Sequence, residues 1–197
     1  MLIADPAPLI RALFIVVAFV VAGFVHSAWL GSRWSRPLMM PLDGGARIRG
    51  RRVFGDNKTV RGFAVMVPAA AASFWMLWMV ISTTSPTIAI ALWWLSPGEY
   101  AVLGAWAGLG FMLGELPNSF VKRQLDIAPG TAPRGRIAAV VSFAVDRLDS
   151  ILGMLLAVSF AAPTPWLTWL YVIVVGPAIH FSFSVLLYRL GVKERTA

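Results

Sequence analysis

The sequence predicts an all-α, polytopic integral membrane protein with about five transmembrane helices. Of the 197 residues, 58% are hydrophobic and only 13% are charged, and the mean hydropathy is +0.75. A soluble domain of this size would expose too much apolar surface, so the chain 1–197 is expected to form a single membrane-embedded domain. Apolar runs of a length that crosses a bilayer predict spans at 8–30, 62–81, 100–116, 137–162 and 166–190.

The distribution of lysine and arginine predicts the orientation of these spans. The connection 31–61 holds eight of them, the connection 117–136 holds four, and three more crowd the C-terminal end. The connections 82–100 and 161–165 hold none. Basic loops face the cytoplasm, so both basic connections and the C-terminus are expected inside, and the N-terminus outside.

Two further segments complete this topology. The first span is expected to be retained, because Asp5 precedes it where a signal peptide would be basic, and bulky Trp29 and Trp34 follow it. The apolar run 87–95 is too short to span, and its two tryptophans suit the membrane interface.

The third span is rich in small residues, including Gly104, Gly108 and Gly110, which let neighbouring helices approach closely. Such a surface would also allow a homodimer. The connections 31–61 and 117–136 do not align with one another, so the inverted-repeat pattern of many transporters is missing.

Composition excludes several kinds of site. The chain has no cysteine and only two histidines, His26 and His180, which argues against disulfides and zinc. Both histidines lie inside apolar spans and are interpreted as hydrogen-bonded core residues. The formal charge is +8, which in a membrane protein reflects its cytoplasmic loops, so no nucleic-acid partner is expected.

Asp146 and Asp149 are the candidate metal ligands. They are three residues apart, near one face of the fourth span, and each acid at bilayer depth costs roughly 2.5–3.5 kcal/mol unless it has a partner. A divalent cation would be such a partner, and Glu115 at the end of the third span can join as a third carboxylate. The alternative is that the acids lie at the water boundary as a solvated helix start.

Two loop elements are candidate phosphate-binding segments. The run 55–62 combines glycines with Asp56, Lys58, Thr59 and Arg61. In the run 118–123, polar and basic residues recur at helical spacing: Asn118, Ser119, Lys122 and Arg123. Carboxylates and cations on one membrane face suit a magnesium-bound nucleotide. The alternative is that the first run is only the basic, turn-forming end of a cytoplasmic loop. In the second run, Lys122 and Arg123 would then only extend their charged ends to the membrane interface.

These elements resemble a known family. Gly-Asp-x-Lys-Thr-x-Arg-Gly at 55–62, Asn-Ser-x-x-Lys-Arg at 118–123 and Asp-x-Leu-Asp at 146–149 are similar to motifs of CDP-archaeol synthase. That family is related to phosphatidate cytidylyltransferases (CDP-diacylglycerol synthases), whose signature ends in Asp-Arg-x-Asp. The resemblance covers roughly Gly50 to the C-terminus.

The sequence also departs from the family patterns. The archaeal type usually has Asp at Glu115, Gly at Asn57 and Gln at Arg147, and the His-Gly-Gly of the diacylglycerol type is absent before Asp146. The resemblance therefore supports the cytidylyltransferase activity better than it supports a particular lipid.

The resemblance implies that CTP and a membrane lipid phosphate, either phosphatidate or an ether-lipid analogue, react to a CDP-lipid and pyrophosphate. It implies catalytic roles for Asp146, Asp149 and Lys122, with Mg²⁺ held by Asp146, Asp149 and Glu115. The implied substrate-binding residues are Asp56, Lys58, Thr59, Arg61, Asn118, Ser119, Lys122 and Arg123.

The expected location is the cell membrane, as a multi-pass protein of the cell inner membrane, with the active site on the cytoplasmic side. The alternative from another class is a non-enzymatic transporter or ion-binding protein that uses the intramembrane pair Asp146 and Asp149.

Overall fold

The computed structural model describes residues 7–131 and 133–191. Its elements are α1 (Ala7–Gly31), the 3-10 helix η1 (Arg33–Leu38), β1 (Arg47–Ile48), β2 (Arg51–Arg52), α2 (Val60–Thr84), α3 (Pro86–Ile90), α4 (Pro97–Gln124), α5 (Arg136–Ala161) and α6 (Trp166–Arg189). The long helices begin and end within a few residues of four of the five predicted spans.

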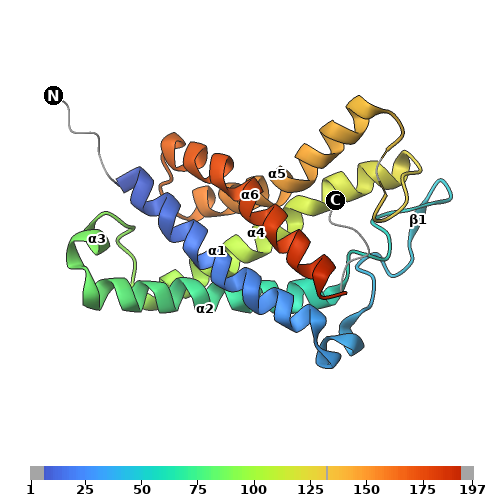
Figure 1. The fold of residues 1–197 in the computed structure, drawn as a ribbon. Coiled ribbons are helices and arrows are strands. Elements are labelled where there is room, and N and C mark those ends of the chain that lie inside the picture. The colour runs from blue at the N-terminus through green and yellow to red at the C-terminus, as the bar shows by residue number, and fades with distance from the viewer. Residues whose placement is uncertain (1–6, 132, 192–197) are drawn as a thin grey trace.

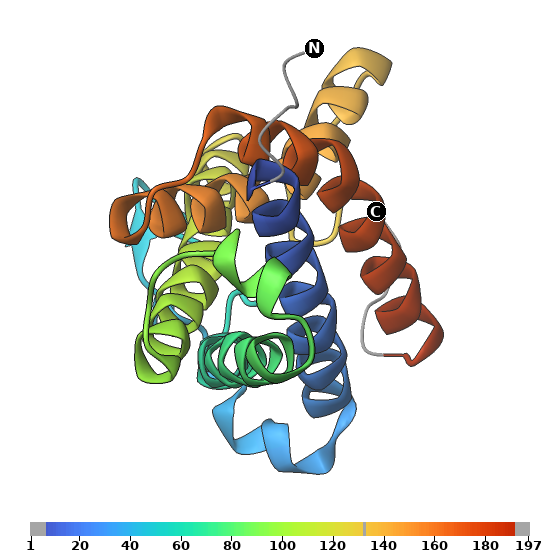
Figure 2. The ribbon, with the colours of Figure 1, turned by 90° about the vertical axis from the view of Figure 1, so that its left-hand side faces the viewer.

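The five long helices contact one another in a closed order, α4, α2, α1, α6, α5 and back to α4. Figure 1 shows α1 and α6 inclined in the same sense across the bundle, and Figure 2 views the bundle from the side on which α3 lies. The main apolar core fills the bundle, and Ile15, Phe74, Tyr100 and Leu155 are fully buried in it. Aromatic side chains pack against one another in this core, with Trp78 stacked on Tyr100 at 4.5 Å between ring centroids.

Glycines allow α4 to approach both of its neighbours. A Cβ added at Gly104 would lie 2.5 Å from the carbonyl oxygen of Ala70 in α2. On the other side, a Cβ at Gly110 would lie 2.5 Å from the carbonyl oxygen of Gly153 in α5. Real side chains cannot adopt such separations, so these residues permit the close packing that the small-residue pattern predicts.

The structure places the end of α4 later than the sequence predicts. The connection was expected from residue 117, but α4 continues through Pro117 to Gln124. The residues beyond the proline recur at helical spacing, and two of them, Asn118 and Lys122, are bonded to α5. These contacts stabilise the helical turn after Pro117, although a proline usually favours the end of a helix.

The helices α1, α2 and α6 are long and apolar enough to cross a membrane. The helices α4 and α5 have 28 and 26 residues but carry the polar side chains of the candidate site. The chain is thus a mostly helical membrane protein, while five spans and their orientation stay predictions. The connection between α1 and α2 adds a short antiparallel hairpin, in which Arg47 pairs with Arg52.

Candidate functional site

The carboxylates of the candidate site come from two helices in close contact. Glu115 lies on α4, and Asp146 and Asp149 lie on α5. A Cβ added at Gly114 would lie 2.4 Å from the main-chain oxygen of Asp149, so the two backbones almost touch at this level. This contact brings polar side chains of α4 within hydrogen-bonding distance of α5.

Asn118 bridges the two aspartates. Its Nδ2 donates to Oδ1 of Asp146 at 2.6 Å and to Oδ2 of Asp149 at 2.8 Å. Lys122, one turn further along α4, donates from Nζ to the two carboxylate oxygens of Asp146, at 2.5 and 2.6 Å. The spacing of four residues places Asn118 and Lys122 on one helix face. The sequence elements at 118–123 and 146–149 therefore form one site.

Glu115 has a different set of partners. Lys58, from the connection before α2, forms an ion pair with it. Ser150 donates from Oγ to Oε1 of Glu115 at 2.7 Å, and its Oγ lies 3.3 Å from Oδ1 of Asp149. The sequence analysis did not single out Ser150, which is fully buried. The sequence feature that could have indicated Ser150 is a hydroxyl directly after the last aspartate of an apolar helix.

Two of the three carboxylates of this cluster form ion pairs with lysines. Lys58 pairs with Glu115 and Lys122 pairs with Asp146, whereas Asp149 forms no ion pair within residues 7–131 and 133–191. Asp149 instead accepts hydrogen bonds from the Asn118 amide and the Ser150 backbone N–H, the latter at 2.6 Å. Asp149 is therefore the one carboxylate of the three without an ion-pair partner among the described residues, and a cation could serve as that partner.

The residues present fit a metal held by two carboxylates. One oxygen of Asp146 and one of Asp149 converge on the same atom, Asn118 Nδ2. Mg²⁺ is commonly bound by one or two carboxylates, with water or phosphate oxygens completing the octahedron. Within the described part of the chain, no group of three acidic, histidine or cysteine side chains is arranged to hold a metal. Glu115 is engaged by Lys58 and Ser150.

The connection that supplies Lys58 is organised by Asp43. Its carboxylate is 1% exposed and accepts hydrogen bonds from Arg52 at 2.7 Å and from the backbone N–H groups of Phe54, Gly55 and Gly45 at 2.9 to 3.1 Å. Burial by itself raises the pKa of Asp43. The hydrogen bonds outweigh the effect of burial, with that from Arg52 the strongest of them, and together they hold the pKa well below its usual value. The sequence analysis did not identify this residue as a site element.

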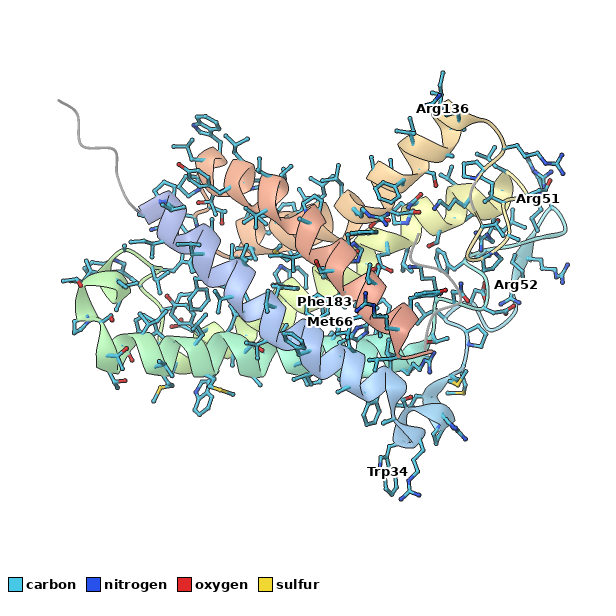
Figure 3. The ribbon with its side chains drawn as sticks, in the orientation of Figure 1. Trp34, Arg51, Arg52, Met66, Arg136 and Phe183 are labelled. Carbon is cyan, nitrogen blue, oxygen red and sulfur yellow. The ribbon has the colours of Figure 1, made fainter. Side chains whose placement is uncertain are left out.

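The hairpin also docks on the end of α4. Arg51 forms an ion pair with Asp126 at 2.5 Å and a hydrogen bond with the carbonyl of Gln124. In return, Gln124 Nε2 donates to the carbonyl oxygen of Arg52 at 3.2 Å. Figure 3 shows Arg51 and Arg52 at this end of the bundle. The two basic connections of the sequence, 31–61 and 117–136, are therefore in contact at the end of the bundle that holds the cluster.

The remaining predicted residues lie around the cluster rather than in it. Asp56 is exposed and pairs with Arg52 at 2.8 Å, Thr59 precedes the first residue of α2, and Ser119 is buried on α4. Arg61 and Arg123 each have a buried Nε without a hydrogen-bond partner among the described residues.

Arg123 lies against the backbone at Gly55, where φ is +87° and a Cβ would lie 3.0 Å from Nη1 of the arginine. Glycine is suited to this position both by its positive φ and by the close approach of the guanidinium.

Arg147, between the two aspartates in sequence, packs against aromatic side chains. It is 6% exposed, its guanidinium lies 3.3 Å from the ring centroid of Phe143, and Phe181 of α6 is 5.0 Å away. This cation–π contact joins α5 to α6 beside the cluster.

Known proteins are similar to this chain in sequence and in fold. The CarS-like family model, described as CDP-archaeol synthase, matches residues 9–196. The CDP-archaeol synthase of Halobacterium salinarum is 33% identical over 162 residues, which cover 78% of this chain and 81% of that protein. The CDP-archaeol synthase of Pyrococcus horikoshii is 31% identical over 164 residues, with 78% and 81% covered.

A solved structure described as "Structural insight into an intramembrane enzyme for archaeal membrane lipids biosynthesis" aligns with a TM-score of 0.52 at 20% identity. The alignment covers 90% of this chain and 93% of that chain, so the two share a fold. Since the family model spans residues 9–196 and the relatives match over most of their length, the chain belongs to the CarS-like CDP-archaeol synthase family.

Proposed function

We propose that this enzyme transfers the cytidylyl group of CTP to a membrane lipid phosphate at the cluster of Glu115, Asp146 and Asp149. Membership of the family makes the chain a CTP-dependent lipid-phosphate cytidylyltransferase. The observation that carries the location is the hydrogen bonding of Asn118 to both aspartates, which unites two of the three sequence motifs in one place.

In this reaction an oxygen of the lipid phosphate attacks the α-phosphorus of CTP. The bond from that phosphorus to the oxygen that bridges to the β-phosphate breaks, and pyrophosphate leaves. A phosphate monoester has a second pKa near 6, so the nucleophile is ionised at neutral pH and needs no catalytic base. The site has to align the reactants and neutralise their charge.

The side chains divide this work. Asp146 and Asp149 would hold Mg²⁺, which supplies charge neutralisation for the phosphates of CTP. Arg61 and Arg123 have buried guanidinium nitrogens without partners in the described chain, so they are available to bind phosphate oxygens. Lys58 and Lys122 position Glu115 and Asp146 before substrate binds. Asn118 joins the two aspartates through its hydrogen bonds to both.

The proposed setting is the cytoplasmic leaflet. The lipid tails stay in the bilayer while the phosphate reaches the cluster, and the chain is proposed to cross the membrane five times. Phosphatidate and ether-linked lipid phosphates are both substrates to be tested, because the cluster recognises the phosphate and not the tails.

The test compares Asp149→Asn with Asp126→Asn, a control in which an exposed aspartate that pairs with Arg51 is changed. Purified proteins receive labelled CTP, Mg²⁺ and either lipid phosphate. Asp149→Asn should lose incorporation of label into lipid while Asp126→Asn keeps it. Near-normal turnover by Asp149→Asn would refute the location.

A second measurement addresses the transporter alternative, which family membership does not favour. Mg²⁺ with CTP should raise the thermal unfolding midpoint of the wild type, since a ligand stabilises the state that binds it. A transporter that uses the aspartates for a cation would respond to the cation and ignore CTP.

A further inference from the structure

A cavity of about 300 Å³ lies at the opposite end of the bundle from the carboxylate cluster. It is formed by the start of α1, the segment before α4 and the end of α5. Its lining residues are Arg11, Trp93, Trp94, Leu95, Ala161, Ala162 and Pro163. Because α4 runs from Pro97 to Gln124, the cavity and Asn118 are separated by roughly 30 Å along this helix. The left-hand end of the ribbon in Figure 1, where α3 lies, is this end of the molecule.

Arg11 brings a positive charge into this cavity. Its Nη1 lies 3.3 Å from the carbonyl oxygen of Pro163 and its Nη2 lies 3.5 Å from that of Leu92, both at the long limit of a hydrogen bond. Its Nε is buried and has no hydrogen-bond partner in the described part of the chain. Arginine has five N–H donors, so most of its hydrogen-bonding capacity remains unused.

No carboxylate within residues 7–131 and 133–191 forms an ion pair with Arg11. The guanidinium lies 5.7 Å from the ring centroid of Trp93, which offsets part of the charge. A cation at the end of an apolar helix is costly unless an anion or water reaches it. The connections at this end, 82–100 and 161–165, contain no lysine or arginine, so the positive charge there comes from Arg11.

The walls of the cavity are fixed in place. Trp93 Nε1 donates to the carbonyl oxygen of Pro163 at 2.8 Å, and the hydroxyl of Tyr100 donates to the carbonyl oxygen of Trp93 at 2.8 Å. Trp94 at the rim is 92% exposed. Exposed tryptophans of membrane proteins prefer the level of the lipid headgroups. Hydrogen bonds thus hold the cavity walls, and an exposed tryptophan lies at the cavity edge.

We propose that this cavity binds the phosphate group of an anionic phospholipid in the leaflet that faces this end of the bundle. Arg11 donates to the phosphate oxygens, Trp94 covers the glycerol region, and the tails lie along the outside of the bundle. The bound lipid supplies an anion to Arg11 and ties α1 to the end of α5. This site is separate from the proposed catalytic cluster and does not depend on the reaction.

The experiment measures thermal unfolding of detergent-purified protein with added phosphatidylglycerol or with phosphatidylcholine of the same acyl chains, in the absence of CTP. The wild type should unfold at a higher temperature with the anionic lipid. Arg11→Gln should lose this difference, and Arg11→Lys should recover part of it by restoring charge. Arg36→Gln, which changes an exposed arginine of η1, should keep the difference.

Native mass spectrometry provides the second readout, the number of phosphatidylglycerol molecules that each protein retains. Loss of one retained lipid in Arg11→Gln supports the proposal. The opposite result is that Arg11→Gln unfolds at a lower temperature by the same amount with either lipid and retains as many lipids as the wild type. Arg11 would then only connect the helix ends, and the proposal would be overturned. Asp149→Asn should keep the effect of phosphatidylglycerol, so failure of the catalytic assignment leaves this test intact.

Discussion

Lys122 of α4 donates hydrogen bonds to the two carboxylate oxygens of Asp146 in α5, at 2.5 and 2.6 Å. A lysine that the sequence assigns to phosphate binding is therefore also the counter-ion of a candidate metal ligand. Its ammonium group fixes the carboxylate on the side that faces α4. The pair can reorganise when a metal and a nucleotide arrive, because the lysine side chain is flexible.

Replacing this lysine should reduce activity. Lys122→Met removes the charge and keeps most of the apolar side chain, so Asp146 loses its cation. A hydrogen bond to a charged group contributes about 1.5–3 kcal/mol, which corresponds to a decrease of about 10- to 150-fold in kcat/KM. The measurement is incorporation of labelled CTP into lipid. Arg134→Gln, at an exposed arginine of the next connection, is the control and should retain activity. Equal activity of the two variants would contradict the role of Lys122.

Ser150→Ala should destabilise the protein and reduce turnover. The variant leaves Oε1 of Glu115 without its hydroxyl donor in a buried environment, at a cost of about 1–3 kcal/mol in the free energy of unfolding. Thermal unfolding in detergent measures this change. Ser182→Ala is the matched control, since that serine is exposed and donates only within its own helix, to the carbonyl of Ala178. If both serine variants unfold together with the wild type, Ser150 has no positioning role.

Gly114→Ala should separate α4 from α5. The new Cβ would lie 2.4 Å from the main-chain oxygen of Asp149, so one helix must shift. Overpacking of this kind costs about 1–3 kcal/mol, and the displacement of Asp149 should lower turnover as well. Gly98→Ala is the control, because a Cβ there meets nothing within 4 Å. Wild-type stability and turnover in Gly114→Ala would show that the contact is not needed.

Asp43→Asn should loosen the connection that carries Lys58. At neutral pH the wild-type carboxylate is ionised and bonded to Arg52, while the variant lacks the charge. Trypsin should therefore cleave the variant faster among the arginines of 47–52. The control is Asp56→Asn, which removes only the exposed partner of Arg52. Equal cleavage rates of the two variants would argue against Asp43 as the organising residue.

The same carboxylate predicts a pH dependence. The pKa of Asp43 is lowered by folding, so its stabilisation is fully present above the unfolded value near 3.9 and is lost as the pH falls through the folded value. The difference in stability between wild type and Asp43→Asn should be constant from neutral pH to about pH 5 and decrease below about pH 4. Hydrogen exchange of the residues 43–55 measures it. A difference that instead changes between pH 5 and 8 would point to another group.

The sequence determined most of the helical layout, because apolar length and helical spacing are local properties. The run of small residues around Gly110 predicted close helix packing, and the spacing of Asp146 and Asp149 predicted that both acids lie near one helix face. The end of α4 was misplaced, since Pro117 is a local signal for a boundary. The tertiary contacts of Asn118 and Lys122 with α5 outweigh that signal.

Only the tertiary structure decided which cation meets which acid. Lys58 and Glu115 are 57 residues apart, and no local pattern predicts that they pair. The roles of Asp43 and Ser150 also depend on groups that folding brings to them, namely backbone amides of the hairpin and the carboxylate of a neighbouring helix. Periodicity and composition act along one helix, whereas hydrogen bonds between elements depend on how the backbones cross, and that crossing is set by the packing of the whole bundle.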